Sequence, residues 1–130
     1  MKKILLIEDD EILLDILQRK LKQEGYDISL ARDGEDGLSK MKEDKPDLVL
    51  LDIIMPKKNG FEVLYEMQND STLSGVPVII ISNSGQPVEI DRAKQMGARD
   101  YIVKTHFDPA EVLTKVVEQL GKEEVKEDNF

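Results

Sequence analysis

DLVLLD, residues 47–52, is an apolar run that ends on an aspartate, and this pattern decides the fold. Three further runs have the same form: KILLI (3–7) precedes Glu8 and Asp9, PVIII (77–81) precedes Ser82, and DYIV (100–103) precedes Lys104. Amphipathic, helix-like segments separate the runs, and this alternation predicts an α/β domain with helices on both faces of a parallel sheet. The carboxyl ends of parallel strands lie along one edge, where ligands bind. The polar residues that follow the runs are therefore expected to meet there.

The same patterns give the bounds of the expected elements. Strands are predicted over residues 3–7, 27–31, 48–51, 78–81 and 101–103, and helices over 11–24, 35–43, a segment that starts near Gly60, 88–96 and 109–120. The run 78–81 contains only β-branched residues, which favours a central strand that is buried on both faces. One domain is expected over residues 1–121, followed by a charged, flexible tail over 122–130.

Composition excludes several classes of function. The chain has 130 residues, enough for one core, and it contains no cysteine, so disulfide frameworks and thiolate metal sites are excluded. A formal net charge of −9 argues against direct DNA binding. The first apolar run is too short for a signal peptide, and no run approaches the length of a membrane span. We expect a soluble, cytoplasmic protein without contact to nucleic acid or membrane.

The acidic residues at the predicted edge need a counter-charge. Two carboxylates about 4 Å apart repel each other by about 4 kcal/mol at an effective dielectric constant near 20. Oxygen ligands without histidine or thiolate suit a hard cation, and Mg²⁺ binds through one or two carboxylates together with water and phosphate. Lys104 supplies a second positive charge, suited to phosphoryl oxygens. These residue types predict that Asp52 is a nucleophile in phosphoryl transfer, with Asp10 and Glu11 left for helix capping or solvation.

Residues 2–120 resemble the receiver domain of two-component response regulators, in its chemotaxis-regulator-like, single-domain form. Four motifs carry the resemblance: ILLIEDD with the acidic pair, LLDIIMP with the phosphoacceptor, PVIIIS with the fourth strand, and GARDYIVK with the fifth. The resemblance implies a doubly wound, flavodoxin-like sheet of five parallel strands in the order 2-1-3-4-5. It further implies that Asp52 accepts a phosphoryl group from a kinase phosphohistidine.

The resemblance also assigns the residues around Asp52. Glu8 and Asp9 would hold Mg²⁺, Asp9 directly and Glu8 through water, with the backbone carbonyl of Ile54 as a further ligand beside Asp52 itself. After phosphorylation, Ser82 would bond the aspartyl phosphate, Lys104 would pair with it, and Tyr101 would change rotamer as Ser82 moves inward. This movement is the switch that the family uses to alter partner binding.

Three of the departures from the family pattern bear on the site. Thr105 follows Lys104 where a proline with a cis bond is common, and Asn83 follows Ser82 where a small residue is favoured. Ile54 stands where a polar side chain can assist the water that removes the phosphoryl group. We therefore expect a long-lived phosphorylated state with slow self-hydrolysis.

The predicted output is a change in partner binding, because no DNA-binding or enzymatic domain follows residue 121. The partners expected are a sensor histidine kinase or histidine phosphotransfer domain and a downstream protein that binds the last two helices and the fifth strand; a homodimer is left open. The chain would not act as an enzyme on a separate substrate. The main alternative is a phosphorylation-independent, receiver-like interaction module. A flavin carrier is disfavoured because residues 8–11 would repel the flavin phosphate, and a hydrolase is disfavoured because nothing forms a substrate cap.

Overall fold

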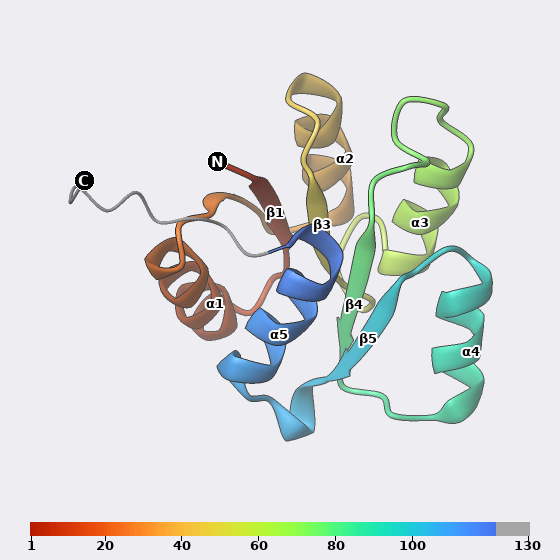
Figure 1. Cartoon of the computed structure of the whole chain (residues 1–130). Coiled ribbons are helices and arrows are strands. Elements are labelled where there is room, and N and C mark those ends of the chain that lie inside the picture. The colour runs from red at the N-terminus through yellow and green to blue at the C-terminus, as the bar shows by residue number, and fades with distance from the viewer. Residues whose placement is uncertain (122–130) are drawn as a thin grey trace.

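Five parallel strands form the centre of the molecule, in the spatial order β2-β1-β3-β4-β5 (Figure 1). Their bounds are β1 Lys3–Ile7, β2 Asp27–Ala31, β3 Leu48–Asp52, β4 Val78–Ser82 and β5 Asp100–Val103. The computed structural model describes residues 1–121, with His106 described by its backbone alone, so the predicted tail over 122–130 lies outside this range. The predicted sheet order is confirmed.

The helices cover both faces of the sheet, as the alternating sequence predicts (Figure 1). Their bounds are α1 Glu11–Gln23, α2 Gly34–Glu43, α3 Gly60–Gln68, α4 Pro87–Gln95 and α5 Pro109–Leu120, and a single 3₁₀ turn, η1, spans Lys104–His106. Apolar residues of α1 and α5 form one core against the sheet, and those of α2, α3 and α4 form another on the opposite face. Within the described part of the chain, no helix has both the length and the apolar character needed to cross a membrane.

Alternation along the strands produces the two cores. Leu5 and Val49 face α2 and α3, whereas Leu6 and Leu50 face α1 and α5. All five residues of β3 and all five of β4 are buried, which matches the prediction of a central fourth strand. Burial on both faces fixes the register, because a slip by one residue would exchange the side chains between the two cores.

The predicted strand ends require a small correction at the site. Strand β3 continues one residue further, to Asp52, and β4 continues to Ser82, because the sheet pairs Asp52 with Ile81 and Ser82 with Val103. Asp52 and Ser82 therefore lie within the sheet edge and not in the loops that follow. Asp10 caps α1 by accepting hydrogen bonds from the backbone N–H groups of Ile12 and Leu13, which confirms the capping role expected for it.

Candidate functional site

Three acids meet at the carboxyl edge of the sheet. Glu8 and Asp9 directly follow β1, and Asp52 ends the neighbouring strand β3, with Ile7 paired to Leu51 in the register. One carboxylate oxygen from each acid lies within 4.8 Å of the other two. The predicted convergence of these acids is thus borne out by the geometry.

The three acids differ in their access to water. Glu8 and Asp52 are each only 4% exposed, whereas Asp9 is exposed. The backbone N–H of Asp10 donates to Glu8 Oε2 at 3.1 Å, and the N–H of Glu8 donates to the carbonyl of Ala31 at 3.0 Å. Glu8 is therefore held in the edge by its own loop and by the end of β2, whereas Asp9 is exposed.

Lys104 is the cation that balances the buried acids. Its Nζ lies 2.7 Å from Glu8 Oε1 and 3.0 Å from Asp52 Oδ2, and its side chain is 15% exposed. Burial disfavours the charged lysine, but the hydrogen bonds to Glu8 and Asp52 outweigh this effect and raise its pKa. The sequence predicts Lys104 near Asp52; it does not predict the shared bond to Glu8.

Burial changes the acidity of the Glu8 carboxyl group. Burial raises its pKa from 4.5 to about 7; the hydrogen bond from Lys104 opposes this, and Asp52 adds to it. Above that pH, one lysine faces two buried carboxylates, so the edge carries an excess of negative charge.

This donor set fits a hard divalent cation. The three side chains offer only carboxylate oxygens, close enough to share one ion, without a nitrogen or sulfur ligand. The buried negative charge that Lys104 leaves unbalanced would attract such a cation electrostatically. The cluster is therefore compatible with the metal site expected from the sequence.

Ser82 and Tyr101 lie on the adjoining strands. Ser82 is 2% exposed at the end of β4, and its Oγ accepts a hydrogen bond from the backbone N–H of Ser84 at 3.2 Å. Tyr101 is 8% exposed, its hydroxyl donates to the carbonyl of Ser84 at 2.7 Å, and burial raises its pKa. Both side chains are thus linked to the loop after β4, while their roles in a switch stay predictions.

The remaining predicted positions surround the edge. The side chain of Ile54 is 73% exposed, and the use of its carbonyl as a metal ligand stays a prediction. All peptide bonds among residues 1–121 are trans, including the bond between Lys104 and Thr105. The turn η1, which the sequence patterns do not predict, begins at Lys104.

A hollow of about 340 Å³ opens beside Lys104. Its walls include apolar side chains from α1 and from the segment before α5, namely Ile12, Leu13, Ile16 and Phe107. Ile12 is 75% exposed and Ile16 is 39% exposed, although both are large apolar residues. An apolar surface therefore borders the acidic edge.

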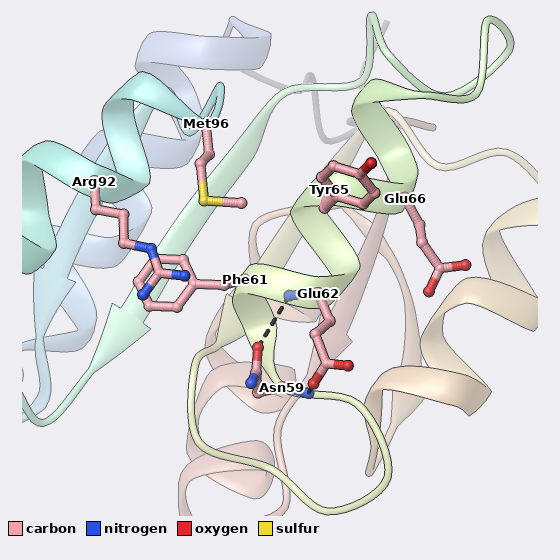
Figure 2. Close-up of a pocket in the computed structure, with 7 residues that line it drawn as sticks. All are labelled: Asn59, Phe61, Glu62, Tyr65, Glu66, Arg92 and Met96. Atoms are coloured by element: carbon pink, nitrogen blue, oxygen red, sulfur yellow. Dashed lines mark hydrogen bonds between the residues drawn. The ribbon is translucent and has the colours of Figure 1, made fainter.

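A second hollow, of about 490 Å³, lies between α3 and α4 (Figure 2). The Arg92 guanidinium lies over the Phe61 ring, 4.0 Å from its centroid. The polar groups nearby bond to one another: Glu62 and Asn59 form a reciprocal cap at the start of α3, and Glu66 pairs with Lys58. None of the acids of the edge lines this hollow, so we assign it no part in the site.

Sequence comparisons show which protein family this chain is similar to. The family described as the response regulator receiver domain matches residues 4–117. The chain is 36% identical to protein PilH of Pseudomonas aeruginosa over 104 residues, which cover 80% of this chain and 86% of PilH. It is 34% identical over 124 residues to the alkaline phosphatase synthesis transcriptional regulatory protein PhoP of Bacillus subtilis, covering 95% of this chain and 50% of PhoP. The chain thus spans about half the length of PhoP.

Solved structures give the same result. A CheY-like response regulator receiver domain protein from Methanospirillum hungatei aligns with a TM-score of 0.84 at 29% identity, covering 92% of this chain and 94% of that chain. Chemotaxis protein CheY4 of Vibrio cholerae aligns with a TM-score of 0.85 at 25% identity, covering 92% of this chain and 98% of that chain. The structural and the sequence comparisons therefore agree on the receiver domain family.

Proposed function

This chain belongs to the response regulator receiver domain family, and we propose that it is a signalling module that accepts a phosphoryl group on Asp52. Receiver domains act in two-component systems, where they interact with histidine kinases and downstream effectors. The observation that carries the proposal is the buried Asp52 carboxylate, placed within 4.8 Å of two further acids and bonded to Lys104. No catalytic action on a separate substrate is part of the proposal.

Asp52 acts as the nucleophile in the proposed transfer. A carboxylate oxygen attacks the phosphorus of a phosphohistidine, a P–O bond forms, the P–N bond breaks, and the leaving imidazole nitrogen takes up a proton. Lys104 stabilises the negative charge of the transferred group, because its Nζ already lies 3.0 Å from Asp52 Oδ2. The Lys104 ammonium group also contacts Glu8 Oε1 at 2.7 Å, and this contact holds it at the edge.

The acids beside Asp52 would hold Mg²⁺. When bound, this cation would neutralise charge on the transferred phosphoryl oxygens. Asp9 offers an exposed carboxylate and Glu8 a buried one, and both lie close enough to Asp52 to share an ion with it. The carbonyl of Ile54 is proposed as a further ligand, in line with the family pattern.

Ser82 and Tyr101 are proposed as the switch. A phosphoryl group on Asp52 would attract the Ser82 hydroxyl, and the bond from Ser84 N–H to that hydroxyl would move with it. The Tyr101 hydroxyl donates to the carbonyl of Ser84, so the same displacement would break this bond and let Tyr101 change rotamer. The affected surface comprises α4, β5 and α5, where we place the downstream partner, or a second copy of the chain.

The phosphodonor would dock beside Lys104. The apolar side chains Ile12, Ile16 and Phe107 line a hollow that borders the acidic edge. Exposed apolar groups next to a reactive centre are typical of a protein docking surface. We propose that a histidine kinase or phosphotransfer domain uses this surface to bring its phosphohistidine to Asp52.

Phosphorylation of the intact protein tests the proposal. The chain is incubated with acetyl phosphate and Mg²⁺, and its mass is compared with that of Asp52→Asn and of a sample that contains a chelator. A phospho-adduct that requires both Asp52 and Mg²⁺ is expected. An equal adduct in the variant would place the phosphoryl group elsewhere. Absence of any adduct, also with a phosphorylated histidine donor, would leave the phosphorylation-independent module as the function.

A further inference from the structure

The loop between β3 and α3, residues 53–59, connects Asp52 to the start of a helix and carries the Ile54 carbonyl. Lys57 within this loop has φ 70°, a left-handed conformation that a residue with a side chain seldom adopts. The backbone N–H of Lys58 donates to the carbonyl of Pro56 at 2.8 Å and closes a three-residue turn around Lys57. A strained turn of this kind persists only when its surroundings hold it.

Helix α3 holds one end of the loop. The N–H of Gly60 donates to the carbonyl of Ile53 at 2.7 Å, and a Cβ on Gly60 would lie 2.8 Å from Ile53 Cα. The reciprocal cap of Asn59 and Glu62 fixes the first turn of the helix, with bonds of 2.9 and 3.1 Å (Figure 2). These contacts bind the loop to the element that follows it.

The start of α2 holds the other side of the loop. The carboxylate of Asp33 lies 3.8 Å from the Lys57 ammonium group. The backbone of Lys58 lies against Gly34, where a Cβ would come within 2.6 Å of Lys58 Cβ and 2.9 Å of Lys58 C, and closer still to its carbonyl oxygen. Gly34 does not have a positive φ, so its own backbone would accept a side chain, and only the contact with Lys58 excludes one.

We propose that Gly34 is a positioning residue for phosphorylation at Asp52: by lacking a side chain, it lets the start of α2 hold the 53–59 loop and its Ile54 carbonyl in place. The inference rests on the proposed function. A methyl group at residue 34 would push against backbone atoms that cannot rotate away, so the loop itself would have to move. Small displacements of groups around a metal or a reacting atom reduce affinity and rate by about 10- to 100-fold.

Gly34→Ala tests the proposal against its main alternative, ordinary helix packing. Alanine is the better helix former, so without the Lys58 contact the substitution would stabilise α2. We expect three effects: faster amide hydrogen exchange in residues 53–59, Mg²⁺ affinity lower by about tenfold or more, and slower labelling by acetyl phosphate at saturating Mg²⁺.

Two controls separate position from stability. Gly75→Ala introduces the same methyl group where nothing lies within 4 Å and should leave all three measurements unchanged. Ile4→Val loosens the core at the amino end of β1, far from the acids, and should lower stability without altering loop exchange or Mg²⁺ affinity. Loop exchange and Mg²⁺ affinity within twofold of wild type in folded Gly34→Ala would overturn the proposal.

A second variant covers the case in which Gly34→Ala does not fold. Asp33→Asn keeps a side chain that caps α2 and removes only the charge that faces Lys57. Faster exchange in residues 53–59 would support the proposal, and unchanged exchange would contradict it. If wild-type protein is not labelled at Asp52, the proposed function fails, whereas hydrogen exchange still decides whether the start of α2 positions the loop.

Discussion

Replacing Glu8 with glutamine should stabilise the metal-free protein at alkaline pH while weakening its metal site. Burial raises the pKa of the Glu8 carboxyl from 4.5 to about 7. At pH 8 the folded chain must hold this group charged in a buried position, where one lysine serves two carboxylates. Glutamine keeps the shape and carries no charge, and its single carbonyl oxygen can accept from only one of the two donors that Glu8 serves, the N–H of Asp10 and the Lys104 ammonium group.

The magnitude follows from the two pKa values. Below pH 4.5 the carboxyl is protonated in both the folded and the unfolded chain, so its full contribution to stability is present. Between pH 4.5 and 7 the unfolded chain loses the proton and the folded chain retains it, so stability falls as pH rises. The loss is complete above the folded value of about 7 and amounts to about 3 kcal/mol, since one unit corresponds to about 1.4 kcal/mol.

Urea unfolding in the presence of a chelator measures the effect. Glu8→Gln should exceed wild type in the free energy of unfolding by about 3 kcal/mol at pH 8 and by less than about 1 kcal/mol at pH 5. The matched control is Glu43→Gln, which removes an exposed carboxylate in α2 and should track wild type at both pH values. Added Mg²⁺ should raise the stability of wild type more than that of Glu8→Gln.

Two results would refute this reasoning. A Glu8→Gln protein less stable than wild type at pH 8 would mean that the bond from Lys104 stabilises the fold by more than burial of the second carboxylate costs. A difference between the two proteins that is equal at pH 5 and pH 8 would mean that Glu8 does not titrate in the range given by its raised pKa.

Three further substitutions probe the site and its surroundings. Lys104→Met should lower the free energy of unfolding in chelator at pH 8 by about 3–5 kcal/mol, because it leaves both buried carboxylates without a counter-charge; urea unfolding measures it. Ile54→Asn should speed the loss of the phosphoryl group, since a polar atom would then face the attacking water; an unchanged or slower decay in time-resolved mass spectra would contradict this. Arg92→Ala should cost about 1 kcal/mol through the lost contact with the Phe61 ring, whereas exposed Lys94→Ala should be neutral in the same thermal melts.

The fold follows from the sequence because local pattern and overall packing agree. Strands β1 and β2 begin and end where the sequence predicts them. Four of the five residues of β1 are buried, so this apolar run has no alternative register on the sheet. The sequence predicts Asp52 and Ser82 just outside their strands, because a polar residue after an apolar run usually indicates the start of a loop. Their inclusion depends on pairing with Ile81 and Val103, and a partner strand cannot be read from one segment alone.

The sequence predicts which residues form the site, but it does not predict the contacts among them. Strand order suffices to bring Glu8 and Asp52 to one edge, because their strands are neighbours. The bond from Lys104 to Glu8 depends on how deeply each side chain is buried, which no spacing records. The contact of Gly34 with Lys58 joins a helix start to a loop from another part of the chain, and a glycine before a helix signals only a turn.

The two substitutions argued most fully separate charge from geometry at the same centre. Glu8→Gln relieves buried negative charge and should raise stability, whereas Gly34→Ala adds a steric conflict and should lower it. Both should weaken Mg²⁺ binding, for different reasons: the first removes a ligand charge, and the second displaces the loop that follows Asp52. Stability and metal affinity should therefore change in opposite directions in one variant and together in the other. A site tuned only by overall stability could not give this result, because every loss of affinity would then accompany a loss of stability.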